Sequence, residues 1–159
     1  MSSKQGDLSL LNEPVAQELL QSTIPARLSY VWSDGTPRVV PVWFHWNGEQ
    51  IVIGTPTGMP KMKVLSPNQK VALTIDSNEF PWKVLLIRGS ISLETVDGLV
   101  PEYMASARRY LGEEGGQGFI DQVRGMLPQW VRISIQPEWV GLLDFEQRWP
   151  SAIEAAMAG

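Results

Sequence analysis

The segment from Arg38 to Leu65, RVVPVWFHWNGEQIVIGTPTGMPKMKVL, constrains the fold more than any other part of the chain. It holds two apolar runs separated by Asn47-Gly48, and both of these residues tolerate the positive φ that a type I′ turn requires. The segment therefore predicts a β-hairpin with strands at 38–46 and 50–54. Counting outward from the turn pairs residues whose numbers sum to about 95, so we expect Arg38 roughly opposite Thr57.

Further strand patterns lie on both sides of this hairpin. Residues 26–32 alternate in polarity, and residues 70–76 and 83–93 are rich in aliphatic side chains. Gly89 lies inside the longest run and predicts a bulge or a sharp bend. Two more β patterns, at 130–136 and 140–145, close the series. Short strands without long helices between them indicate an antiparallel meander, so we expect a mainly β protein with a six- to seven-stranded antiparallel barrel and peripheral helices.

Helical patterns occur outside these strands. Residues 14–22 begin with proline and repeat apolar side chains at helical spacing. A second helix is expected from 97 to 111, with Gly112 as its natural end. The glycine-rich residues 113–118 are predicted to form a flexible connector before a weaker helical stretch. The tail, 147–159, is expected either to form a short helix or to stay loose.

The composition indicates one soluble domain spanning residues 1–159, with its core at about 24–145. The chain has 159 residues, of which 43% are hydrophobic and 19% are charged. Its formal net charge of −4 argues against a general binder of nucleic acid or anionic membranes. The N-terminus lacks the pattern of a signal peptide, and no apolar run approaches the ~20 residues of a membrane helix. Together with the absence of cysteine, this leads us to expect a cytoplasmic protein.

Residues for protein-borne catalysis are scarce. The single histidine, His45, lies between Phe44 and Trp46, where a structural or surface role is expected. With no cysteine and no clustered histidines, the sequence predicts no metal site and no catalytic residue. The glycines at 115–118 follow a helix, not a strand, so they do not form a dinucleotide-binding motif.

A local set of cations and hydroxyl groups remains in this acidic chain. Arg38 begins one predicted strand, Thr55 and Thr57 end its partner, and Lys61 follows in the next turn. An arginine fork, hydroxyl groups and a lysine at one point suit a phosphate monoester. A solvated surface cluster is the alternative interpretation.

The order of these features resembles that of the pyridoxamine 5′-phosphate oxidase-like superfamily, the flavin-binding split barrels. The resemblance covers about 24–145 and rests on ARLSYVWSDGTPRVVPVWFHWNGEQIVIGT, the Lys61–Leu65 K-x-x-x-L pattern, PNQKVALTID, VLLIRGSISL and VRISIQPEWVGLLDF. It implies a split β-barrel, a homodimer, and FMN bound in a groove at the dimer interface.

The resemblance also implies roles for individual residues. Arg38 and Lys61 would bind the phosphate, with Thr55 and Pro56 beside it. Backbone groups of Val39–Val42 would lie along the isoalloxazine edge. Lys83 stands where the family has a glutamine, and a lysine there would stabilise negative charge on the reduced flavin. The implied cofactor-binding residues are Arg38, Val39, Val40, Pro41, Val42, Thr55, Pro56, Lys61, Trp82 and Lys83.

Departures from the family pattern indicate which branch of the family the chain resembles. The vitamin B6 oxidase is disfavoured, because DFEQRWPSAIEAAMAG lacks its C-terminal arginine and histidine pattern and Trp43 replaces an expected lysine. Met59 stands where members that bind the deazaflavin F420 often carry a basic residue. The leading hypothesis is therefore an FMN-dependent oxidoreductase that transfers hydride to an unidentified small molecule. The alternatives are an F420-dependent reductase and a non-catalytic protein that stores or senses a flavin or haem.

Overall fold

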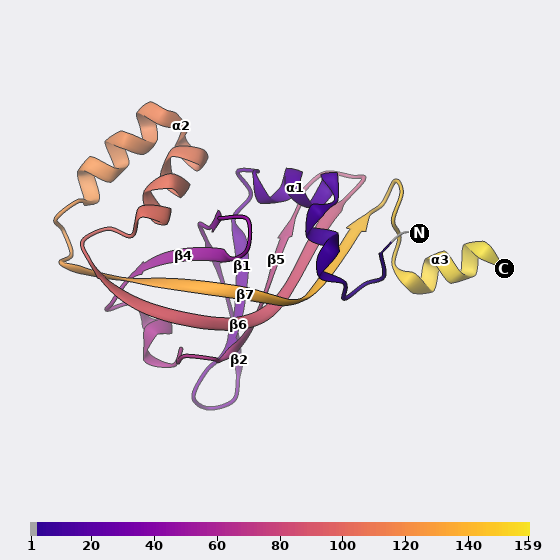
Figure 1. Ribbon diagram of the computed structural model, residues 1–159, viewed down its shortest axis with the longest axis horizontal. Coiled ribbons are helices and arrows are strands. Elements are labelled where there is room, and N and C mark those ends of the chain that lie inside the picture. The colour runs from indigo at the N-terminus through magenta and orange to yellow at the C-terminus, as the bar shows by residue number, and fades with distance from the viewer. Residues whose placement is uncertain (1–2) are drawn as a thin grey trace.

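Seven antiparallel strands form one curved sheet in the order β2-β1-β5-β6-β7-β4-β3 (Figure 1). The computed structural model describes residues 3–159. Its strands are β1 (Ala26–Val31), β2 (Pro37–Val42), β3 (His45–Trp46), β4 (Ile51–Pro56), β5 (Lys70–Asp76), β6 (Lys83–Asp97) and β7 (Gln129–Asp144). The two longest, β6 and β7, pair along their whole lengths and run across the molecule. The expected antiparallel sheet of six to seven strands is confirmed.

Five helical segments surround the sheet. They are η1 (Leu8–Asn12), α1 (Pro14–Leu20), η2 (Pro60–Lys63), α2 (Pro101–Val123) and α3 (Ser151–Ala158). α2 covers the end of the sheet near β4, whereas α3 projects at the C-terminus with no buried residue (Figure 1). Within residues 3–159, no helix is both long enough and apolar enough to cross a membrane.

Most strand positions agree with the sequence patterns, and the glycine bulge is confirmed. The register between β6 and β7 shifts at Arg88/Gly89. A Cβ at Gly89 would collide with the carbonyl of Gln136, so no larger residue fits without a shift of the backbone. The two closing strands proved to be one strand, β7, because the chain continues through this bulge without a turn.

The predicted long hairpin was wrong in its pairing. Only β3 and β4 pair across the Asn47 turn, with Trp46 opposite Ile51, so the register sum is 97. Asn47 Oδ1 accepts hydrogen bonds from the backbone N–H groups of Glu49 and Gln50, which places Gly48 and Glu49 at the centre of the turn. Gly48 has φ +99°, the positive φ that a type II′ turn needs at its first central residue.

β2 pairs with β1 and not with β4. Arg38 lies opposite Tyr30, and the pairing continues to Val42 opposite Ala26. The chain leaves the strand geometry at residues 43–44 before β3 begins, so the predicted strand 38–46 is divided. The short turn after β1 therefore brings β2 back alongside β1.

The flexible connector predicted at 113–118 was also wrong. These residues are helical and belong to α2, which bends at Gly112 (φ +80°). Gly116 is buried, and a Cβ there would lie 2.5 Å from the Cα of Arg108. Glycine here allows the two arms of the bent helix to pack closely.

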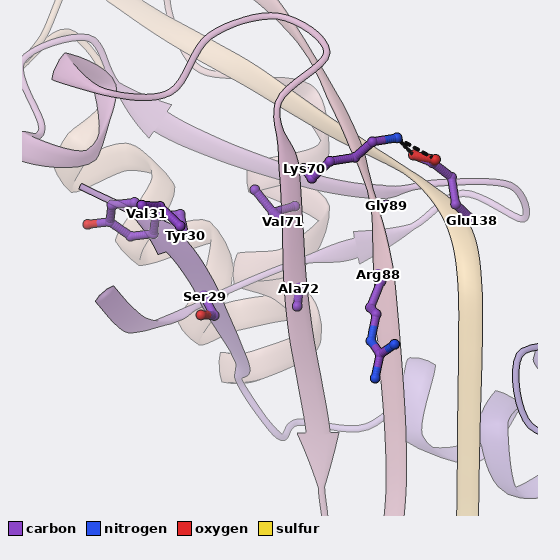
Figure 2. Close-up of a pocket in the computed structure, with 9 residues that line it drawn as sticks. All are labelled: Ser29, Tyr30, Val31, Lys70, Val71, Ala72, Arg88, Gly89 and Glu138. Carbon is purple, nitrogen blue, oxygen red and sulfur yellow. Dashed lines mark hydrogen bonds and ion pairs between the residues drawn. The ribbon is translucent and has the colours of Figure 1, made fainter. Parts of the chain in front are cut away.

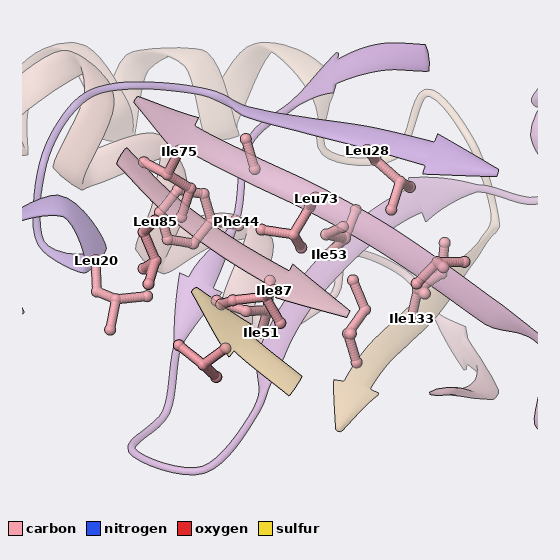
Figure 3. Packing of buried hydrophobic residues seen from close by; sticks show 14 of the residues in the cluster. Leu20, Leu28, Phe44, Ile51, Ile53, Leu73, Ile75, Leu85, Ile87 and Ile133 are labelled. Carbon is pink, nitrogen blue, oxygen red and sulfur yellow. The ribbon is translucent and has the colours of Figure 1, made fainter. Parts of the chain in front are cut away.

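The core lies between the concave face of the sheet and the N-terminal helices (Figure 3). Strands from both halves of the sheet contribute branched aliphatic side chains, and α1 adds Leu19 and Leu20. Phe44, in the link between β2 and β3, is completely buried in the same cluster. Burial of this link fixes where β2 ends and β3 begins.

Candidate functional site

The end of β4 and the following helical turn carry two predicted phosphate ligands. Thr55 is 2% exposed and shares the core-facing side of β4 with Ile51 and Ile53. After Pro56 the chain turns, and the Met59 N–H donates to the Pro56 carbonyl at 3.2 Å. Pro60 then opens η2, whose first turn holds Lys61.

Lys61 is the least exposed lysine side chain of this region. The residue is only 9% exposed, and burial lowers the pKa of its ammonium group. No carboxylate of residues 3–159 forms an ion pair with it. Lys63, two residues later on η2, is exposed. Lys61 Nζ is not among the fully buried, unpartnered atoms, so the end of this largely buried side chain keeps access to solvent. A partly desolvated ammonium group without a counter-ion is costly, so this position favours binding of an anion.

Arg38 lies near the start of β2, where it pairs with Tyr30 of β1. Its side chain is exposed, and the guanidinium lies over the Trp32 ring at 5.0 Å from the ring centroid. No ion pair engages Arg38 within the described part of the chain. Because β2 pairs with β1, Arg38 does not lie opposite Thr57, just after β4, as the sequence predicted.

The remaining predicted residues of β2 alternate between the two faces of the sheet. Val40 and Val42 pack against the core cluster. Val39 is 65% exposed and Pro41 is also exposed, on the opposite face. The backbone of this strand stands at an edge of the sheet, since β2 is hydrogen-bonded only to β1.

Trp82 and Lys83 lie far along the sheet from Thr55 within one chain. Thr55 pairs with Val131, and Val131 pairs with Thr95 of β6, twelve residues along the strand from Lys83. The ammonium group of Lys83 forms an ion pair with Glu18 at 3.0 Å, and this hydrogen bond raises the pKa of the lysine. One chain therefore does not bring both groups of predicted ligands together.

An open pocket of about 430 Å³ lies on the outer face of β1, β5 and β6 (Figure 2). Its lining includes Ser29, Val31, Ala72 and Arg88, and its upper rim holds the ion pair between Lys70 and Glu138. β1 and β5 pair only from Arg27 to Ser29 of β1, so the two strands diverge at this end. Val39 lies on the same face, opposite Ser29.

The sequence analysis missed an aromatic cluster between α2 and the strands. Trp43 stacks on Tyr110 at 5.2 Å with an interplanar angle of 11°, and it contacts Phe119 edge-on at 5.4 Å. Tyr103 joins Trp43 to Trp130, with ring centroids 5.7 Å and 4.7 Å away. No local pattern could have shown this cluster, because Trp43 and Trp130 come from segments distant from α2 in the sequence.

Polar contacts hold this cluster in place. Arg109 donates to the carbonyls of Ser22 and Phe44 at 3.0 and 2.5 Å. Arg132 forms an ion pair with Glu102 at 3.0 Å, which fixes the first turn of α2 on β7. These bonds fix α2 against both β7 and the link before β3.

Among residues 3–159, no group of three or more acidic or histidine residues is arranged to hold a metal ion. His45 is partly buried in β3, and desolvation, with a smaller contribution from the nearby charge of Arg109, lowers its pKa.

Comparison with known proteins adds two findings. A family model described as pyridoxamine 5′-phosphate oxidase matches residues 13–144. The comparison with curated protein sequences found no relative.

Several solved structures share the fold at low sequence identity. An F420 reductase is 23% identical, with 79% of this chain and 94% of that chain covered and a TM-score of 0.57. A conserved hypothetical protein from Mycobacterium tuberculosis is 18% identical, with coverages of 91% and 90% and a TM-score of 0.64. The haem storage protein HutZ from Vibrio cholerae is 21% identical, with coverages of 83% and 93% and a TM-score of 0.59. The split-barrel fold is common to proteins with different cofactors.

Proposed function

Because the chain belongs to the pyridoxamine 5′-phosphate oxidase family, we propose that it is an FMN-dependent oxidoreductase acting on a small molecule. The observation that carries this proposal is the burial of Lys61 without a carboxylate partner among the described residues. A phosphate monoester supplies the negative charge that this ammonium group lacks. Family membership supports a flavin as the molecule that carries the phosphate.

Different residues would hold the phosphate and the ring of the cofactor. Lys61 and the Thr55 hydroxyl group hold the phosphate from the end of β4, and Arg38 adds a bidentate guanidinium from the start of β2. The free edge of β2 offers backbone N–H and C=O groups from Val39 to Val42 for the polar edge of the ring. When bound, the flavin accepts and donates hydride. The protein positions the ring and excludes water from it.

The complete site requires a second copy of the chain in this proposal. Trp82 and Lys83 are too far along β6 to meet the ligand held by Lys61 of the same chain. The outer sheet face also exposes apolar side chains, with Val39 at 65% and Val31 at 50% exposure. We place the homodimer contact on this face, around the pocket in Figure 2, so that each copy completes the other's site.

Two alternatives share the same scaffold. F420 also carries a phosphate and a flat ring, and the fold is shared with an F420 reductase. A protein that stores or senses haem would need an iron ligand, for which His45 is the only histidine.

Binding of FMN is tested directly by titration of the purified chain. We expect a yellow protein whose visible absorbance bleaches with dithionite and which binds FMN more tightly than F420. Parallel titration with F420 and with haemin distinguishes the three cofactors, since haemin binding gives a Soret band. A colourless protein that takes up no added FMN would exclude the proposal.

A further inference from the structure

We propose that the aromatic cluster under α2, formed by Trp43, Tyr103, Tyr110, Phe119 and Trp130, binds a flat, uncharged ring system that carries a hydrogen-bond acceptor. This inference rests on the proposed function, because it assigns the substrate subsite of the same protein. It identifies the surface beside the flavin strand that selects the substrate.

The first observation is the exposure of the cluster. Trp43, Tyr103, Tyr110 and Phe119 are all partly exposed, although each contacts another ring of the cluster. Aromatic rings packed only to fill a core would be covered. Offset and edge-on contacts with a further flat ring are favourable in this geometry.

The second observation is an unpartnered buried donor. Trp130 is 4% exposed, and its Nε1–H has no hydrogen-bond partner in the described structure. Buried donors are normally satisfied. The Tyr103 ring packs against this indole at 4.7 Å between centroids. A ligand oxygen that enters beside Tyr103 would accept this hydrogen bond, so the cluster favours a carbonyl-bearing ring over a plain hydrocarbon.

The third observation is the position of the cluster relative to the proposed site. Trp43 directly follows Val42, the last residue of the strand assigned to the flavin ring. Trp130 lies opposite Pro56, next to the proposed phosphate ligand Thr55. The aromatic wall therefore joins both segments that we assign to the cofactor.

The charge around the cluster supports an uncharged ligand. The nearby cation Arg109 is held by two backbone carbonyls, and Arg132 is neutralised by Glu94 and Glu102. The Tyr110 hydroxyl donates to the Ile24 carbonyl at 3.0 Å. Among the fully buried donors of the cluster, the Trp130 N–H is left without an acceptor in the described structure.

A pair of probes separates stacking from hydrogen bonding. Menadione and 2-methylnaphthalene share one methylated bicyclic ring, but only menadione has carbonyl oxygens. Their dissociation constants are measured by calorimetry without a reductant, on protein saturated with FMN and on protein without it. Phe119→Leu should weaken both probes roughly 3- to 10-fold, the range of one aromatic contact. Phe119→Tyr should restore binding.

Trp130→Phe removes the donor and keeps a ring. It should weaken menadione roughly 3- to 10-fold, as expected for one hydrogen bond, and leave 2-methylnaphthalene unchanged. Trp149→Leu is the matched control, because the partly exposed Trp149 ring packs on Phe145 away from this cluster. Circular dichroism and thermal melts verify that each variant is folded.

The outcomes distinguish this inference from the proposed function. If FMN binds but Phe119→Leu and Trp130→Phe leave both dissociation constants unchanged, the aromatic subsite is wrong and the FMN site stands. If FMN does not bind but both variants weaken menadione as expected, the subsite stands and the FMN proposal is wrong. Equal losses in Trp149→Leu would also overturn the subsite, because the effect would not be local.

Discussion

Gly54 of β4 lies directly against Tyr103 of α2, so closely that a Cβ on the glycine would approach the Tyr103 Cβ to 2.7 Å. Val100, just before α2, is nearly as close, at 3.1 Å. The absence of a side chain at residue 54 thus allows α2 to dock on the strand that leads to Thr55. This contact therefore lies between the aromatic cluster on α2 and the proposed phosphate site at the end of β4.

Gly54→Ala should therefore destabilise the protein. Overpacking a tight contact costs roughly 1–3 kcal/mol of unfolding free energy. Urea denaturation followed by tryptophan fluorescence measures this loss. Gly58→Ala is the control, since a Cβ at Gly58 meets nothing within 4 Å. Equal stability of the two variants would contradict the close docking of α2.

The two arms of α2 offer a second matched pair. Gly116→Ala should destabilise the protein by roughly 1–3 kcal/mol, because the new Cβ meets the backbone of Arg108. Gly118→Ala should stabilise it by roughly 0.5–1 kcal/mol, because a Cβ there is free and alanine favours the helix. Thermal melts that shift in the same direction for both would exclude this packing.

Lys61→Ala should weaken FMN binding by roughly 1–3 kcal/mol, the cost of removing one partner of a charged group. Lys63→Ala should leave the dissociation constant within twofold of the unchanged protein, because Lys63 is exposed on the same turn. Quenching of flavin fluorescence measures both constants. Equal effects of the two substitutions would mean that only general charge attraction is involved.

The buried Lys61 also predicts a pH dependence in the protein without FMN. Its folded-state pKa is lowered from 10.5 by burial, so between the folded pKa and 10.5 the unfolded chain binds more protons. The free energy of unfolding should therefore rise with pH across this window relative to Lys61→Met. The variant should be more stable than the unchanged protein at pH 7, and the difference should shrink as pH approaches 10.5. A constant difference would contradict an ammonium group that is destabilised in the folded state.

Val39→Lys tests the proposed dimer. A lysine on the outer sheet face should convert a dimer to a monomer in multi-angle light scattering, because two like charges would approach across the two-fold contact. It should also weaken FMN binding if the site is shared. Val31 offers a second position on the same face, as Val31→Lys. An unchanged protein that is monomeric while flavin is bound would contradict the shared site.

Local sequence signals predicted the elements of this fold well. Gly89 marked the bulge, because only a residue without a side chain avoids a collision with the carbonyl of Gln136 at this position. Pro14 marked the start of α1 because its fixed φ suits the first helical turn. The order of strands, together with the quoted motifs, was sufficient to predict a split barrel.

Local signals did not predict which strands pair. The register at Asn47 depends on side-chain hydrogen bonds to Glu49 and Gln50. The pairing of β2 with β1 follows the short turn between them, and the buried Phe44 interrupts the predicted strand 38–46. The helical state of 113–118 was missed because Gly116 gains contacts with Arg108 that helix propensity does not describe.

By itself, the sequence determined the positions of most strands, the main bends and the membership of the pyridoxamine 5′-phosphate oxidase family, because these depend on periodicity, glycine and proline, and motif order. Only the tertiary structure decided that Lys61 is largely buried with no counter-ion among residues 3–159, that Lys83 lies far along the sheet from Thr55, and that five aromatic rings meet under α2. Burial and pairing arise from contacts between distant segments, so no local pattern specifies them.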